Sequence, residues 1–221
     1  MKKLILFLLI VFGVMSFQAN AQFLVGGNLG FSKYQDHDDQ GTNEDETTFT
    51  SFTLIPRLGY AFGNSWAGLD AGITSLKIEA TGFEDYSSTI NLTTINPFYR
   101  YIQKPTDNFG IWIEGQAGAT FGKDKVADVV QTNYFGLNFG LRPGIIFYFG
   151  KKLTFEASFG SFGFSKITAT SEADSNNKET VTNFGLGINN TSGILQLYSN
   201  NAPNYTPGFQ FGVNWMFNSG E

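Results

Sequence analysis

Large apolar residues alternate with small or polar residues along most of this chain. The last stretch of this kind has an apolar residue at every second position: Phe209, Phe211, Val213, Trp215 and Phe217. The segments at 23–34 and 133–149 follow the same period. Because successive side chains of a β-strand point to opposite faces, a period of two gives each strand one apolar face and one different face. The sequence therefore predicts an all-β fold.

Eight segments can be laid out as such strands. They cover residues 23–34, 49–62, 66–78, 88–102, 109–121, 133–149, 153–165 and 206–217. The links at 63–65, 103–108 and 150–152 are short, whereas those at 35–48, 79–87, 122–132 and 166–205 are long and polar. In an antiparallel up-and-down order, all short turns and both termini fall at one end, and all long loops fall at the other. The last link contains further strand-like material at 181–188 and 193–198, so eight strands are expected and ten are the alternative.

The polar face of these strands is rich in glycine and carries isolated charges. Glycine is poor material for a solvent-facing strand but fits where side chains crowd inside a narrow closed barrel. The charges predict an interior cluster of Arg57, Asp70, Arg100, Glu114, Arg142 and Glu156. The first two fall almost opposite each other, the next two are diagonal, and the last two are further apart along their hairpin. Because unpaired charges are costly in a water-poor interior, opposite charges are expected to pair and plug the lumen.

Three prolines lie within the expected strands, on the apolar face: Pro56, Pro97 and Pro143. Proline lacks the N–H that a central strand donates to its neighbour. These positions therefore predict bulges or places where ladder bonds are locally missing.

The apolar face carries aromatic residues near the short-turn ends of the strands: Tyr60, Phe62, Tyr101, Phe147, Phe149, Trp215 and Phe217. Aromatic girdles of this kind mark the water–lipid boundaries of membrane barrels. Strands of about 10 residues tilted by roughly 45° cross a bilayer. The features favour a closed transmembrane barrel over a soluble lipocalin-like barrel, whose apolar face would point inward.

Residues 1–21 are expected to be a secretory signal peptide. Lys2 and Lys3 precede an apolar run at 4–14, and the small residues Ala19 to Ala21 form a cleavage site before Gln22. The apolar run is too short to span a membrane. Cleavage would leave 22–221 as one barrel domain. The chain has no cysteine, which excludes a disulfide framework. Its net charge of −5 argues against a nucleic-acid partner.

On these patterns the chain resembles the small outer-membrane β-barrel proteins of Gram-negative bacteria, the OmpA/OmpX-like "outer membrane protein β-barrel domain" family. The resemblance implies a monomer in the outer membrane, in contact with its lipid and lipopolysaccharide. It also implies that the alternating residues from Phe209 to Phe217 are the signal read by the outer-membrane assembly machinery. The chain departs from the family pattern because Asn218 to Glu221 follow the last aromatic residue.

The sequence offers little catalytic chemistry. The only histidine is His37, and no nucleophile motif accompanies it, so a lipid-A-modifying enzyme is not expected. The acidic stretch at 36–46 echoes the first half of a calcium loop but has Thr47 where a bidentate glutamate is needed, so no metal or cofactor is expected. Those carboxylates could instead meet divalent cations that bridge lipopolysaccharide phosphates. The expected role is structural, adhesive or surface-binding, with ligands contacting the long loops; a narrow porin for small solutes is the alternative.

Overall fold

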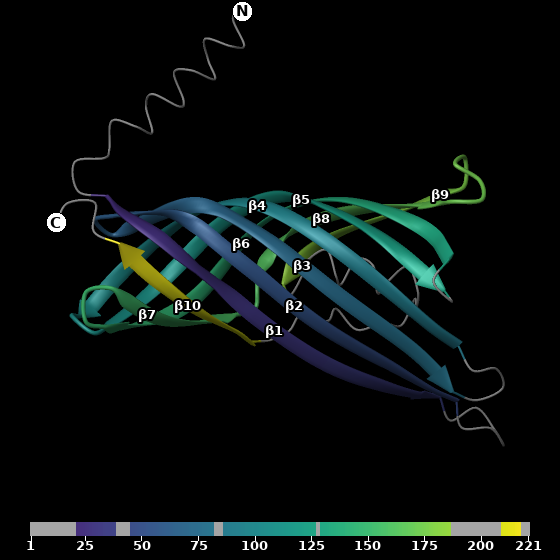
Figure 1. The fold of residues 1–221 in the computed structure, drawn as a ribbon, viewed down its shortest axis with the longest axis horizontal. Helices are drawn as coiled ribbons and strands as arrows, with labels where there is room; N and C mark the ends of the chain where they lie inside the picture. The colour runs from purple at the N-terminus through teal and green to yellow at the C-terminus, as the bar shows by residue number, and fades with distance from the viewer. Residues whose placement is uncertain (1–20, 39–44, 82–85, 127–128, 187–208, 218–221) are drawn as a thin grey trace, which may run out of the picture.

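The computed structural model describes residues 21–38, 45–81, 86–126, 129–186 and 209–217. This part of the chain is built of antiparallel strands (Figure 1). The strands are β1 (Gln22–Asp38), β2 (Asp45–Phe62), β3 (Ser65–Thr81), β4 (Tyr86–Thr106), β5 (Phe109–Val126), β6 (Val129–Phe149), β7 (Leu153–Phe159), β8 (Phe162–Ser171), β9 (Lys178–Leu186) and β10 (Phe209–Phe217).

Eight of these strands close into a ring. Strands β1 to β7 pair in chain order, β7 pairs with β10, and β10 pairs with β1. The predicted eight-stranded antiparallel barrel is confirmed. The start of β1 and the end of β10 lie at the same end as the short turns, on the left of Figure 1. Gly63 and Gly150 have φ angles of +56° and +68° in those turns, which only glycine adopts without strain.

Strands β8 and β9 lengthen the barrel wall at two of the eight strand positions, at the end opposite the short turns. Strand β8 pairs with the first half of β6 and β7 with its second half, so both strands occupy one position. The prediction of one continuous strand over 153–165 is wrong, because the chain is interrupted at Gly160, whose φ is +63°. Strand β9 pairs with β8 and covers most of the strand-like segment at 181–188. The second such segment, 193–198, lies outside the described residues.

The three prolines mark ladder irregularities, as predicted. Pairing of β2 with β3 stops at Leu54 and resumes at Arg57, on either side of Pro56, with no change of register. Pairing of β4 with β5 is interrupted in the same way around Pro97. Pro143 lies in β6 opposite the break between β7 and β8, where the register shifts by one residue.

The expected long loops are largely strand. Ladder pairs continue to Asp38–Asp45, Glu46–Thr81 and Val126–Val129, well beyond the expected strand ends. Backbone hydrogen bonds do not require apolar side chains, so polar segments rich in threonine extend the barrel wall past its apolar part. The expectation of long loops at 35–48, 79–87 and 122–132 is therefore wrong for the described residues.

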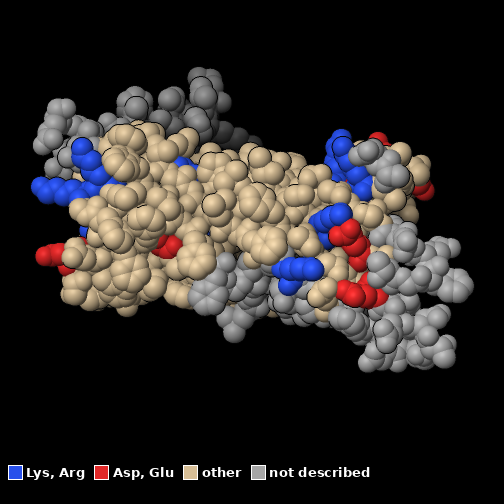
Figure 2. Space-filling model, turned by 60° about the horizontal axis from the view of Figure 1, so that its bottom comes forward, with Lys and Arg blue, Asp and Glu red and all other residues tan. Residues whose placement is uncertain are grey.

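The outer wall of the ring is apolar across its middle. Exposed side chains on it include Phe31, Phe52, Ile73, Ile95, Phe121, Phe139, Phe164 and Phe211, which we call the apolar belt together with their large apolar neighbours on the same face. Figure 2 shows the charged residues gathered towards the two ends and a wide uncharged surface between them. The aromatic residues expected at the short-turn rim are exposed, apart from Phe62, which is half-buried. No helix among the described residues is long and apolar enough to cross a membrane.

Candidate functional site: the charged lumen

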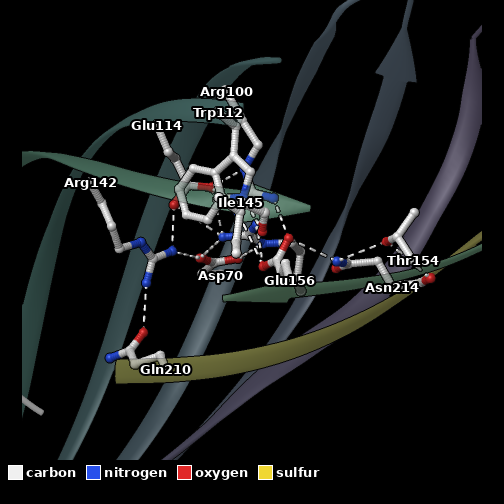
Figure 3. Close-up of polar contacts among 11 residues, drawn as sticks. Asp70, Arg100, Trp112, Glu114, Arg142, Ile145, Thr154, Glu156, Gln210 and Asn214 are labelled. Carbon is white, nitrogen blue, oxygen red and sulfur yellow. Dashed lines mark hydrogen bonds and ion pairs between the residues drawn. The ribbon is translucent and has the colours of Figure 1, made fainter. Parts of the chain in front are cut away.

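Six consecutive strands of the ring each place one charged side chain in a single layer of the lumen. In order from β2 to β7 the charges are Arg57, Asp70, Arg100, Glu114, Arg142 and Glu156. Their signs alternate from strand to strand, and each residue is at most 6% exposed. Strands β10 and β1 complete the circle with the amides Gln210, Asn214 and Asn28. The structure thus brings the whole predicted cluster together in one layer (Figure 3).

Arg57 and Asp70 form a pair joined by two hydrogen bonds. They are direct partners in the β2–β3 ladder, and Arg57 donates from Nε to Oδ1 at 2.7 Å and from Nη2 to Oδ2 at 2.6 Å. This two-bond geometry is the strongest that a guanidinium and a carboxylate make.

Glu114 lies at the centre of the cluster, because it contacts all three arginines. Arg57 Nη2 lies 2.9 Å from its Oε2, Arg100 Nε donates to Oε2 at 2.9 Å, and Arg142 Nη2 donates to Oε1. Glu114 is the direct ladder partner of both Arg100 and Arg142. The expected diagonal placement of Arg100 and Glu114 is therefore wrong.

Glu156 connects the cluster to the far side of the ring. It accepts from Arg100 Nη1, from Arg100 Nη2 at 3.2 Å, and from Asn214 Nδ2 at 3.0 Å. The Asn28 amide nitrogen also donates to Glu156, at 3.0 Å, when the amide is oriented to satisfy its neighbours. Arg142 donates to Gln210 at 2.7 Å rather than to Glu156. The alternation of the last strand already places Gln210 and Asn214 on its lumen-facing side, but their contacts with the charged side chains were not predicted.

Aromatic rings cover the arginines. The guanidinium of Arg57 lies 4.0 Å from the centre of the Phe98 ring, and that of Arg100 lies 3.8 Å from the centre of the Trp112 ring. Contacts of this kind are worth more when they are desolvated, as these are. Trp112 is itself fixed by donating from Nε1 to the carbonyl oxygen of Ile145 at 3.0 Å.

Apolar side chains fill the lumen on both sides of the charged layer. The lower apolar cluster, towards the short turns, comprises Leu24, Ala61, Trp66, Phe98, Ile102, Trp112, Ile146, Tyr148 and Met216. The upper apolar cluster comprises Phe49, Leu76, Ile78, Ile90, Leu92, Tyr134 and Ile167. Between the charges and the upper cluster lie paired hydroxyls, including Thr53 with Thr74 at 3.0 Å and Thr94 with Thr120 at 2.8 Å. The sequence analysis did not predict this layering.

A pocket of about 360 Å³ opens at the short-turn end of the lumen. Trp66, Tyr148 and Met216 of the lower apolar cluster line it, together with Lys104 and Lys151. None of the six buried charges lines it, so the pocket ends at the lower apolar cluster. The three positive and three negative groups balance one another in formal charge.

The other residues singled out in the sequence lie away from this layer. Phe211, Val213, Trp215 and Phe217 are exposed on the outer wall of β10, whereas the side chain of Phe209 lies outside the described residues. His37 is in β1, opposite Glu46 in the ladder. The acidic stretch is not a loop at its ends, because 36–38 belong to β1 and 45–46 to β2, and 39–44 lie outside the described residues. Among the described residues there is no cluster of metal-ligating side chains.

A ring of antiparallel strands with an apolar outer wall and a charged layer in its interior is typical of a transmembrane β-barrel. The family model "Outer membrane protein beta-barrel domain" matches residues 4–217, and the chain belongs to this family of outer-membrane proteins. The outer membrane protein OprG from Pseudomonas aeruginosa is similar in structure at 12% sequence identity, with a TM-score of 0.46 over 91% of this chain and 97% of that one. No curated protein matches the sequence.

Proposed function

We propose that this protein is a non-conducting outer-membrane barrel that has a structural, adhesive or surface-binding role at the end opposite the short turns. The observation that carries the proposal is the closed layer of six alternating charges, seated on the lower apolar cluster. We infer that a lumen filled in this way offers no route for a solute. Partners would then bind at the surface opposite the short turns.

The end opposite the short turns supports a binding role because its strands extend past the apolar belt. The turn between β8 and β9 is held by hydrogen bonds there: Asn177 N donates to Asp174 O at 3.0 Å, and Asn176 N donates to Asp174 Oδ1 at 2.9 Å. A polar hairpin tip that is held by its own hydrogen bonds presents polar groups to a partner at a lower entropic cost than an unbonded one. No catalytic role, metal or cofactor is part of this proposal.

Attachment and permeability distinguish this proposal from the narrow-porin alternative. Cells that lack the protein would be complemented with the wild type or with a variant in which residues 172–176 are replaced by Asn-Gly, a two-residue hairpin turn that keeps Ser171 opposite Asn177. We expect the variant to reduce attachment of cells to a surface, and neither chain to change the uptake of small solutes. Faster solute uptake with both chains, and no difference in attachment, would favour the porin.

We also propose that residues 1–21 direct export and are removed before Gln22. The assembly machinery would then recognise the residues from Phe209 to Phe217, and the barrel would stand as a monomer among outer-membrane lipids. The mass of the protein recovered from outer membranes tests the cleavage site. A mass that includes residues 1–21 would contradict it.

A further inference from the structure

Four lysines stand on the outer wall just beyond the apolar belt, at the end opposite the short turns. They are Lys33 on β1, Lys77 on β3, Lys123 on β5 and Lys166 on β8, and all are exposed. We call these four residues the lysine girdle. Each belongs to a strand that runs away from the short turns, so every second position of the ring contributes one lysine.

The girdle borders the belt directly. Lys33, Lys123 and Lys166 each follow an exposed phenylalanine by two residues: Phe31, Phe121 and Phe164. Because residues two apart share a face of a strand, each lysine stands beside a ring that faces lipid. Lys33 and Lys77 are both ladder partners of Thr50, which places them two strands, or roughly 10 Å, apart. Figure 2 shows lysine or arginine side chains at this border of the uncharged surface.

Among the described side chains, three of the four girdle lysines have no counter-charge on the wall. Lys77 Nζ pairs with Glu79 Oε1 at 2.7 Å, and both side chains are about half exposed. Within the described part of the chain, no carboxylate lies within ion-pair distance of Lys33, Lys123 or Lys166. These three cations therefore stand at the edge of the hydrocarbon, with stems that can lie along it and amines that reach into the headgroup layer.

The membrane itself supplies the missing anions. Short turns of outer-membrane barrels face the periplasm, so the girdle lies at the headgroup level of the outer leaflet. The anionic groups at that level of the outer leaflet are the phosphates of its glycolipid. We propose that the lysine girdle binds the phosphate groups of lipid A. This inference rests on the outer-membrane location of the barrel and not on the role of its lumen.

Binding of purified lipid A to the full-length mature chain, folded in detergent and measured by native mass spectrometry, tests this proposal. The probe is lipid A with both phosphates, compared with the same lipid after removal of its phosphates. One variant carries Lys33→Gln, Lys123→Gln and Lys166→Gln. The matched control carries Lys104→Gln, Lys151→Gln and Lys152→Gln, an equal loss of charge at the short-turn end.

We expect the girdle variant to bind the phosphorylated lipid more weakly by on the order of a hundredfold, or roughly fivefold for each lysine. The control should bind like the wild type, and the dephosphorylated lipid should not distinguish the three proteins. Equal affinity of the wild type and the girdle variant, or equal losses in both variants, would overturn the proposal. Heat-dependent gel mobility verifies folding. If the triple variant does not fold, the single variants Lys123→Gln and Lys166→Gln replace it, and each is expected to bind the phosphorylated lipid roughly fivefold more weakly.

Discussion

Arg100 of β4 reaches Glu156 of β7, a strand three positions further round the ring, with Nη2 3.2 Å from Oε1. In a ring of eight strands, the opposite wall is only four positions away. The contact therefore crosses most of the lumen, and the two side chains together fill the space between these two parts of the wall. It links the paired charges of β2 to β5 with the amides of β10 and β1.

Removing either member of the Arg57–Asp70 pair should destabilise the barrel. Arg57→Ala leaves the Asp70 carboxylate buried without its two-bond partner, and Asp70→Ala does the same to the guanidinium. We expect each change to lower the free energy of unfolding by about 3–5 kcal/mol. Urea unfolding of the folded barrel in lipid vesicles, followed by tryptophan fluorescence, measures this. The double variant should lose less free energy of unfolding than the sum of the two single losses. Lys151→Ala, on an exposed turn, is the control and should be neutral. Single variants as stable as Lys151→Ala would show that the pair contributes nothing to stability.

Neutralising Glu114 should cost more than neutralising Asp70. Glu114 contacts three arginines, whereas Asp70 has one close partner and a second at 3.9 Å. Glu114→Gln keeps the shape but leaves three cations facing two carboxylates in a buried layer. The same urea measurement compares it with Asp70→Asn. A smaller loss for Glu114→Gln than for Asp70→Asn would show that Glu114 is not the centre of the cluster.

The period of two and the identity of the polar face could be predicted from the sequence, and with them the six buried charges. Ladder partners across the tight turn at Gly63 also follow from the sequence, because a short turn fixes the register of the strands that it joins. The partner of Arg142 could not be predicted in this way. It depends on the register of β5 against β6, whose connecting segment is longer and reads as loop.

The extent of the strands could not be predicted either. Apolar alternation ends where the wall leaves the lipid, whereas the ladder continues through polar residues such as Thr47 and Thr48. The layering of the lumen depends on the tilt of the strands, which brings residues at different distances from the turns to the same level. Hydrophobic periodicity along a single strand contains no information about that tilt.

A side chain at Gly144 should be harmful, although the position lies in a regular strand. A Cβ there would clash with the Trp112 ring and lie 2.5 Å from the Ala157 carbonyl oxygen. We expect Gly144→Ala to lower the free energy of unfolding by about 1–3 kcal/mol through overpacking. Gly30→Ala is the matched control, because its Cβ would meet Thr53 Cβ at an ordinary 3.6 Å. If both variants unfold at the same urea concentration, the close packing around Trp112 is not what requires glycine.

The end of β10 should determine assembly. Phe217 is exposed on the outer wall and pairs with Phe23 of β1, where the ring closes. We expect Phe217→Ala, or truncation before Trp215, to lower the yield of protein in the outer membrane and to leave unfolded protein in the periplasm. Removal of Asn218 to Glu221 alone should be neutral. Cell fractionation with immunoblotting measures both, and a harmful deletion combined with a silent Phe217→Ala would place the recognised signal elsewhere.

Electrical recording tests whether the lumen is closed. Purified barrel would be inserted into a planar lipid bilayer and the current followed at fixed voltage. Because paired charges and apolar clusters fill the interior, we predict no reproducible unitary current steps from the wild-type protein. Steps of constant size from the folded wild-type barrel, absent from a mock preparation, would show that the lumen is open and establish the protein as a pore.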